Sequence, residues 1–210
     1  MRIWILYLFL IAAITISLLA WFCDKLPGDE AVMRWVQTYD DSAFVDCMKT
    51  VSIFGQSWLL IGLAGVVAAG LFIMHRPREG FVAVGALILK MVAPLMKDLI
   101  DRPRPPADMV IAADPFGEAG FPSGHAYQSL ILFGFLIWLV PTFVSRKWVC
   151  RSIQVMLGLL IAAIGFSRIH LGAHWPSDVL GSYIIGGFFL SLLIWAYHKK
   201  ELPQQFRRKP

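Results

Sequence analysis

Long apolar stretches alternate with short polar stretches along the whole chain. Roughly 20 consecutive apolar residues can cross a bilayer as a helix. Six stretches predict such helices, at residues 3–22, 52–74, 80–100, 123–144, 153–170 and 178–197. The first could instead be a signal sequence, but it is longer than a usual signal core and no small-x-small cleavage site follows it. The pattern therefore predicts an all-α, six-helix integral membrane bundle that forms a single domain over residues 1–210.

The polar stretch at residues 24–49 separates the first two predicted spans. Apolar residues recur within it at the spacing of one helix face, at Ala31, Val32, Trp35, Val36 and Tyr39. This spacing favours a short amphipathic helix on the membrane surface between helices 1 and 2. A solvated connector with one packed face fits the same pattern. A second polar stretch, at 101–121, is rich in proline and aspartate and could form a lid or a lip over a site.

The third predicted span carries three residues that are unusual inside a membrane. Pro94 should kink the helix. Lys90 and Lys97 lie two turns apart, so both should face the interior of the bundle rather than lipid.

Composition and charge agree with a membrane protein. The chain is 58% hydrophobic and only 16% charged, which is too apolar for an ordinary soluble domain. Its net charge of +5 does not indicate nucleic-acid binding, because the basic residues form short clusters and no continuous patch. Six spans place both ends of the chain on one side. Basic residues gather on that side, which predicts cytoplasmic termini, and they are Arg2, Arg76, Arg78, Arg146, Lys147, Arg151, Lys199, Lys200, Arg207, Arg208 and Lys209.

The three cysteines have no spacing typical of a metal site or of a redox pair. Cys23 and Cys47 would lie on the same external side of the membrane. A disulfide between them is therefore open if that compartment is oxidising.

Three polar segments, at residues 97–105, 121–125 and 167–178, lie at the predicted external ends of the last four spans. Charged residues at such positions are costly, so they indicate a functional site. Lys97, Arg104 and Arg168, together with the helix start at Ser123 and Gly124, would form a cradle for an anion such as a phosphoryl group.

His174 and Asp178 are four residues apart. The carboxylate could accept the proton of one ring nitrogen and leave a lone pair on the other, which activates a histidine as a nucleophile. His125 could then protonate the leaving oxygen. Because the two histidines need opposite protonation states, we expect a bell-shaped dependence of activity on pH.

Each of these motifs also has a simpler interpretation. A single lysine or arginine at a helix end often anchors the helix at the membrane interface, and Pro-Ser-Gly-His can be a turn followed by a helix cap. His170, His174 and Asp178 could hold a metal on one helix face. Gly172 and Pro176 disfavour the continuous helix that such a metal site would need. The three segments on one side of the membrane favour a shared site.

Taken in order, the motifs resemble the three-part signature of the type 2 phosphatidic acid phosphatase superfamily. The first is Lys97, six residues and then Arg104-Pro105; the second is Pro122-Ser123-Gly124-His125; the third is Ser167-Arg168, then His174 and Asp178. The six-span layout is also similar. The resemblance implies a phosphatase that works through a phosphohistidine, without a metal or another cofactor.

The resemblance also implies a role for each matching residue. His174 would be the nucleophile, Asp178 its orienting partner and His125 the general acid. The phosphate would be held by Lys97, Arg104, Ser123, Gly124 and Arg168. His170 stands where many similar chains carry an aromatic residue, and no catalytic role is expected for it. Vanadium haloperoxidases share the motif logic, but a bacterial-style membrane bundle without a further domain argues against that activity.

A site at the outer membrane–water boundary suits a phosphate anchored by lipid tails. The resemblance implies a multi-pass protein of the bacterial cytoplasmic membrane, and phosphatases of undecaprenyl diphosphate, phosphatidylglycerophosphate or lipid A are its candidates. We favour undecaprenyl diphosphate, whose recycling requires dephosphorylation on the external or periplasmic face, although fold does not fix substrate. A lipid phosphotransferase and a non-catalytic transporter or scaffold for anionic lipid are the alternatives. Simple binding needs no nucleophile, which argues against the last.

Overall fold

A computed structural model describes residues 3–111 and 119–199. Within these ranges the elements are α1 (Ile3–Phe22), α2 (Asp29–Val36), α3 (Ser42–Ile53), α4 (Ser57–Ile73), α5 (Pro77–Leu89), α6 (Val92–Ile100), the 3₁₀ turn η1 (Ala107–Met109), α7 (Gly124–Phe143), α8 (Lys147–His170) and α9 (Pro176–Lys199). These ranges contain no strand, and the predicted all-α fold is confirmed for them. Part of the polar stretch at 101–121 and five of the basic residues counted above, Arg2, Lys200, Arg207, Arg208 and Lys209, lie outside the described residues.

The described chain holds five or six candidate membrane spans. Five segments are long and apolar enough to cross a membrane: α1, α5 together with α6, α7, α8 and α9. The helices α3 and α4 pass the same test only as a pair, and they meet at an angle of 44°. The chain therefore has six spans if this bent pair crosses the membrane as one.

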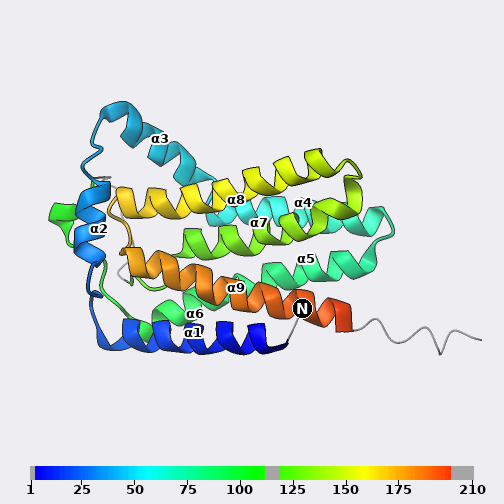
Figure 1. The fold of residues 1–210 in the computed structure, drawn as a ribbon, viewed down its shortest axis with the longest axis horizontal. Coiled ribbons are helices and arrows are strands. Elements are labelled where there is room, and N and C mark those ends of the chain that lie inside the picture. The colour runs from blue at the N-terminus through cyan, green and yellow to red at the C-terminus, as the bar shows by residue number, and fades with distance from the viewer. Residues whose placement is uncertain (1–2, 112–118, 200–210) are drawn as a thin grey trace, which may run out of the picture.

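The helix α7 lies at the centre of the bundle. It packs against α4, α5, α8 and α9, while α1 packs against the outer side of α9 (Figure 1). Apolar side chains of α7 enter both large core clusters, Tyr127, Ile131 and Phe135 in one and Leu132 and Phe133 in the other. Since these clusters fix α7 on several sides, they also fix its first turn at one end of the bundle.

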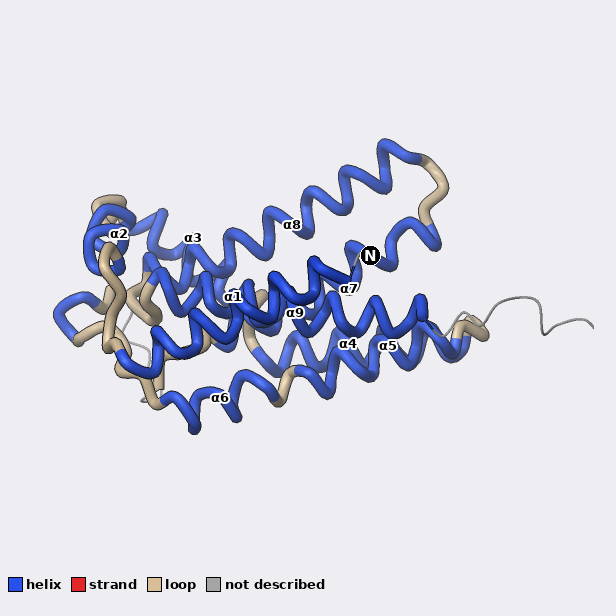
Figure 2. Tube along the Cα trace, turned by 60° about the horizontal axis from the view of Figure 1, so that its bottom comes forward, coloured by secondary structure: helices blue, strands red, loops and turns tan. Residues whose placement is uncertain are grey.

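The loops gather at the two ends of the bundle (Figure 2). One end carries the short turns between α4 and α5 and between α7 and α8, together with Ile3 and Lys199 (Figure 1). The opposite end carries α2, the last turn of α8 and the first turns of α7 and α9. The three polar segments of the sequence therefore meet at the end that α2 crosses.

The helix of the third span is interrupted close to the predicted position. The helix α5 ends at Leu89 and α6 begins at Val92, two residues before Pro94. Because Pro94 has no N–H group, it cannot donate to the carbonyl of Lys90, and the helical hydrogen-bond ladder is interrupted there.

Helical structure ahead of the second predicted span begins earlier than the hydrophobic pattern predicts. The helix α3 starts at Ser42, inside the stretch expected to be a polar connector. Asp41 caps α3, since its Oδ1 accepts hydrogen bonds from the N–H groups of Ala43 and Phe44 at 2.9 and 3.3 Å. Met48 is buried against Leu171, which follows α8. The cap and this packing stabilise α3. The helix was not predicted from the sequence, because its composition is a mixture of polar and apolar residues.

The helix predicted within residues 24–49 is present as α2. It is amphipathic, with Met33 and Val36 buried and Trp35 exposed. It crosses the end of the bundle and packs against α8 and α9 (Figure 1). One packed face is thus found, while a position on the membrane surface stays a prediction.

Candidate active site

The structure brings the motif residues of all three polar segments to one end of the bundle. Lys97 comes from the last turn of α6 and Arg104 from the loop that follows it. Ser123 is the N-cap of α7, and His125 lies in the first turn of that helix. Arg168 lies in the last turn of α8. His174 lies in the turn between α8 and α9, and Asp178 lies in the first turn of α9.

The turn between α8 and α9 sets the spacing of the histidine and the aspartate. At Gly172 the backbone has a φ of +78°, and a Cβ there would lie 2.3 Å from the carbonyl oxygen of Met109. A glycine is therefore required both by the conformation and by the close approach of the neighbouring loop. The new helix begins at Pro176, and Oδ2 of Asp178 accepts a hydrogen bond of 2.9 Å from the Trp175 N–H group. This contact is half of a capping box, and it fixes Asp178 beside the turn.

His174 is buried between a carboxylate and a guanidinium. Its Nδ1 lies 3.7 Å from Oδ2 of Asp178 and its Nε2 lies 3.3 Å from Nη1 of Arg104. Since a guanidinium can only donate, Nε2 must carry the lone pair, and the proton of the neutral ring belongs on Nδ1, facing the carboxylate. This is the tautomer that the sequence motif requires for a nucleophilic Nε2.

The surroundings of His174 keep its ring neutral. Burial is the main cause, and it holds the pKa of His174 well below the usual 6.5. The nearby positive charges of Arg104, Lys97 and Arg168 lower this pKa further. The ring is thus neutral at neutral pH, and the lone pair on its Nε2 faces the guanidinium of Arg104.

The three predicted cations are each anchored by a hydrogen bond to a neutral oxygen. Lys97 Nζ donates to the carbonyl of Ala119 at 2.7 Å, and Arg104 Nη1 donates to the carbonyl of Ala173 at 2.7 Å. Arg168 Nη1 donates to the hydroxyl of Ser52 at 2.6 Å. All three cations also lie close enough to His174 for their positive charge to lower the pKa of its ring. Such an arrangement gathers positive charge where an anion could bind.

Ser123 occupies the N-cap position of α7, as predicted, but it makes no capping hydrogen bond. Its hydroxyl is fully buried and has no hydrogen-bond partner among the described residues. A buried polar group without a partner costs free energy. Together with the free N–H groups at the start of a 20-residue helix, this hydroxyl could bind an anionic oxygen.

Two residues that the sequence did not single out support the site from the break between α3 and α4. Ser52 holds Arg168 through the hydrogen bond just described. Gly55 packs so closely on His125 that a Cβ there would lie 2.9 Å from the ring carbon Cδ2. The sequence predicts an uninterrupted span from Ser52 onward, so it carries no signal that marks either residue as part of the site.

His170 does not join the site. Its Nε2 lies 2.7 Å from the carbonyl oxygen of Tyr39, and its ring packs against Phe44 and Phe166. Among the described residues no group of three or more His, Cys, Asp and Glu side chains could hold a metal. The alternative of a metal on His170, His174 and Asp178 therefore lacks the geometry it requires.

Two further residue predictions have definite outcomes. Lys90 is half-buried beside Gln128 and apolar side chains of α4, α5 and α7, which agrees with an inward-facing lysine. Cys23 and Cys47 are both free, so the open disulfide is not formed.

Apolar helices of membrane-spanning length, with histidine and basic side chains gathered at one end, define a helical integral membrane protein with a histidine-centred polar site. Residues 79–202, more than half of the chain, match the profile of the PAP2 superfamily. The chain therefore belongs to the PAP2 superfamily and is a phosphatase, as its motifs predicted.

Three similar proteins cover most of the chain. Phosphatidylglycerophosphatase B of Bacillus subtilis (strain 168) is 24% identical over 189 residues, which are 87% of this chain and 88% of the relative. Undecaprenyl-diphosphatase of Sulfolobus acidocaldarius is 26% identical over 200 residues, or 91% and 90% of the two chains. The crystal structure of a transmembrane PAP2 type phosphatidylglycerolphosphate phosphatase from Bacillus subtilis has a TM-score of 0.76 at 20% identity, and the match covers 91% of this chain and 96% of that one. The last comparison shows that the two share a fold.

Proposed function

We propose that this phosphatase hydrolyses a lipid phosphate or diphosphate through a phosphohistidine on His174, without a metal. The observation that carries the proposal is the environment of His174. Its Nε2 bears the lone pair and lies 3.3 Å from the guanidinium of Arg104, and its Nδ1 faces Asp178. A neutral imidazole beside a group of cations can attack the phosphorus of an anion that the same cations bind.

The reaction proceeds in two steps. In the first, Nε2 of His174 attacks phosphorus, the bond between phosphorus and the leaving oxygen breaks, and His125 gives its proton to that oxygen. In the second, water attacks the phosphohistidine, His125 takes a proton from the water, and inorganic phosphate leaves with Nε2 restored. Asp178 stabilises the positive charge that develops on the imidazole.

Five groups would hold the phosphoryl oxygens in both steps. They are the side chains of Lys97, Arg104, Ser123 and Arg168 and the N–H group of Gly124. Their charges favour a transition state in which negative charge spreads over three oxygens. A phosphate bound there would also bring negative charge close to His125.

For the substrate we propose undecaprenyl diphosphate, presented from the external leaflet. The site lies at one end of a membrane bundle, where a headgroup phosphate can meet it while the tails stay in lipid. The relative from Sulfolobus acidocaldarius, which is similar over nearly the whole length, is an undecaprenyl-diphosphatase. Phosphatidylglycerophosphate is the second candidate, because the Bacillus subtilis relative is a phosphatidylglycerophosphatase.

The charges at the other end of the bundle support an external position of the site. The described turns and helix starts there carry Arg76, Arg78, Arg146 and Lys147, and Lys199 ends α9 beside them. Basic residues favour the cytoplasmic side of a membrane. We therefore propose that the protein is a multi-pass protein of the bacterial cytoplasmic membrane whose termini are cytoplasmic.

The test is phosphate release by the detergent-purified protein in the presence of EDTA. Undecaprenyl diphosphate and phosphatidylglycerophosphate are assayed side by side, with His174→Ala as the control. We expect release from at least one lipid, faster for undecaprenyl diphosphate, and none with His174→Ala. A terminally ³²P-labelled substrate, quenched in alkali, should label the wild-type protein on histidine. Activity that survives in His174→Ala would refute the nucleophile, and release only when a second lipid is added as acceptor would indicate a phosphotransferase.

A further inference from the structure

Arg102 is a fully buried charged side chain next to the site. Only 1% of the residue is exposed, although it lies in the loop that follows α6. Its Nε donates to the carbonyls of Cys23 and Asp24 at 3.0 and 3.1 Å, which follow α1. Its Nη1 donates to Ser177 Oγ at 2.8 Å and to Asp178 Oδ1 at 2.5 Å. One guanidinium thus joins the end of α1 to the start of α9.

The two oxygens of Asp178 have separate partners. Oδ1 accepts from Arg102, whereas Oδ2 accepts from the Trp175 N–H group and faces Nδ1 of His174. Because Oδ1 is held by a charge-assisted hydrogen bond, the carboxylate cannot rotate freely about its Cβ–Cγ bond. The contacts with Arg102 and with the Trp175 N–H group therefore together fix which oxygen is presented to His174, and at what angle.

Asp29, in the first turn of α2, completes the arrangement from the other side. Its carboxylate is 4% exposed, and its Oδ2 lies 3.2 Å from Nη2 of Arg102. It also accepts hydrogen bonds from the N–H and hydroxyl groups of Ser177 at 2.8 and 2.6 Å and from the Leu26 N–H group at 2.7 Å. A buried arginine is tolerated only when its partners are complete. Asp29 supplies the partner that keeps Arg102 in place against Asp178.

Arg102 differs in position from the three cations of the cradle. The structure leaves 0% of its side chain exposed, and the contacts described above surround the guanidinium with Asp29, Asp178, Ser177 and two backbone carbonyls. It has no surface to offer to a substrate phosphate, so any effect on the reaction must be indirect, and Asp178 is the one partner of Arg102 that faces His174.

We propose that Arg102, held by Asp29, is a positioning residue that orients Asp178 toward the nucleophilic histidine. The short helix α2 places Asp29 beside Arg102. The inference rests on the phosphohistidine mechanism proposed above, and it adds two residues that the phosphatase motifs do not contain.

The first test is a double-mutant cycle on Arg102 and Asp178. Arg102→Ala should lower kcat by about 10- to 100-fold, by analogy with the loss of a residue that orients a metal-ligating side chain. KM for the lipid should change little, since Arg102 makes no contact with the substrate whose loss would weaken binding. In an Asp178→Asn background, adding Arg102→Ala should cost less than about twofold more, because the group through which Arg102 acts is already changed. Equal losses in both backgrounds would show a general structural role and overturn the proposal.

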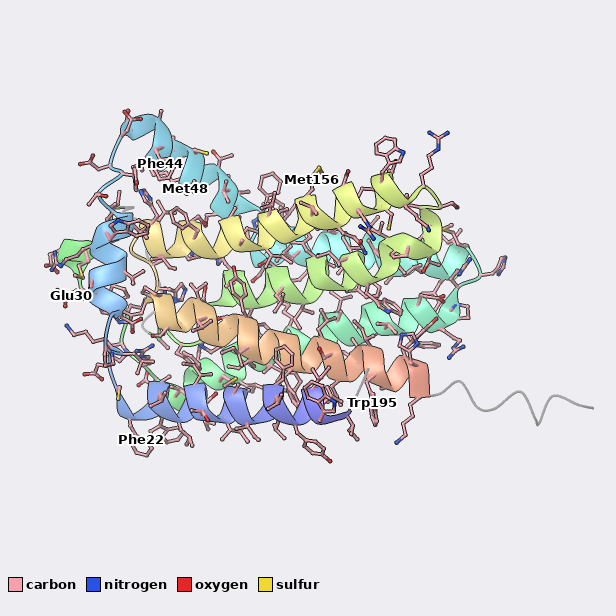
Figure 3. All side chains as sticks on the ribbon, viewed as in Figure 1. Phe22, Glu30, Phe44, Met48, Met156 and Trp195 are labelled. Carbon is pink, nitrogen blue, oxygen red and sulfur yellow. The ribbon has the colours of Figure 1, made fainter. Side chains whose placement is uncertain are left out.

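A second pair of variants tests the part of Asp29. Asp29→Ala should lower kcat several-fold, whereas Glu30→Ala should leave kcat unchanged. Glu30 is the matched control because it neighbours Asp29 on α2 but points away from the bundle and pairs with the exposed Lys25 and Arg34 (Figure 3). Equal kcat values for the two variants would remove Asp29 from the proposal.

Arg102→Ala leaves two buried carboxylates and could fail to fold. In that case the cycle is carried out with Arg102→Lys, which keeps the charge but cannot bond Asp178, Ser177 and Asp29 at once. The same pattern is expected with a smaller loss in kcat. If Arg102→Lys matches the wild type in kcat while Asp178→Asn is impaired, the inference fails and the proposed function stands. If Asp178→Asn itself keeps wild-type activity, the proposed mechanism fails first.

Discussion

The guanidinium of Arg168 donates a hydrogen bond of 2.6 Å to the hydroxyl of Ser52, which lies 116 residues earlier in the chain. Both side chains are buried, and the bond joins the last turn of α8 to the end of α3. Arg168 is one of the proposed phosphate ligands, so Ser52 helps to set where one of the three cations points. A hydrogen bond to a charged group contributes about 1.5–3 kcal/mol, enough to matter for a binding geometry.

Replacing Ser52 with alanine should lower kcat/KM by about 10-fold, because Arg168 would lose the contact that fixes its direction. The measurement is phosphate release over a range of lipid concentrations. Ser57→Ala is the matched control, since the Ser57 hydroxyl makes a comparable bond of 2.8 Å to Gln128 Oε1 without touching Arg168. Similar losses in the two variants would mean that the Ser52 contact has no specific effect on the site.

Gly55→Ala should lower kcat by more than about 10-fold. The new Cβ would lie 2.8 Å from Ile164 Cγ2 and 2.9 Å from Cδ2 of His125, so one of these side chains must move. General acid catalysis typically accelerates a reaction by about 10²- to 10⁴-fold, so a full displacement of His125 would lower kcat by up to that factor. The control is Gly62→Ala on the next helix, where a Cβ meets no atom within 4 Å. A kcat in Gly55→Ala equal to that of Gly62→Ala would mean that the new methyl group does not displace His125.

Arg104→Ala should lower kcat by about 10²- to 10³-fold, as for the loss of one donor to the transition state. The guanidinium spans the Ala173 carbonyl and Nε2 of His174, so it lies where the phosphorus must approach. Arg34→Ala removes an equal charge from the exposed pair with Glu30 and should have no effect on kcat. The prediction is wrong if both arginine variants keep wild-type rates with either lipid.

The sequence predicted much of the site because its residues stand where hydrophobic runs end. The four-residue spacing of His174 and Asp178 predicts their proximity, and a turn at Gly172 delivers it without a continuous helix. The start of α7 at Ser123 follows from a proline and a small polar residue before an apolar run. What the pattern could not show is that the Ser123 hydroxyl makes no capping bond, since that depends on where the neighbouring helices place it.

The supporting residues could not be predicted for a physical reason. Arg102 and Asp29 are 73 residues apart, and their contact exists only once α2 has docked across the end of the bundle. No local periodicity marks such a pair, and a polar residue in a loop is usually exposed. The start of α3 at Ser42 was missed similarly, because its capping aspartate and its packing on α8 outweigh a weak hydrophobic pattern.

Folding stability should decrease as the pH falls below about 6.5, the ordinary pKa of histidine in an unfolded chain. The folded-state pKa of His174 is held lower, chiefly by burial and then by Arg104. Below pH 6.5 the unfolded chain therefore binds a proton that the folded protein does not, which favours unfolding. The measurement is Tm in detergent from pH 8 to pH 5 for the wild type and for His174→Gln.

Between pH 8 and pH 5 the Tm of His174→Gln should fall less than the Tm of the wild type, since the variant lacks the titrating ring. All other groups are common to the two proteins, so the difference between the curves isolates His174. If the two curves run parallel, the ring of His174 does not have a lowered pKa. A neutral His174 also predicts that the acidic limb of the activity profile lies below pH 6.5.

The orientation of the site can be tested with two introduced cysteines. Glu30 lies exposed on α2 at the end that carries the site (Figure 3), and Arg146 lies exposed in the turn between α7 and α8 at the opposite end. In a background in which the native cysteines are replaced by serine, a membrane-impermeant maleimide should label Glu30→Cys in intact cells. Arg146→Cys should be labelled only after the membrane is permeabilised. The reverse pattern would place the site on the cytoplasmic side. The substrate phosphate would then have to be reached from the inner leaflet, and the reason for choosing undecaprenyl diphosphate in the external leaflet would be lost.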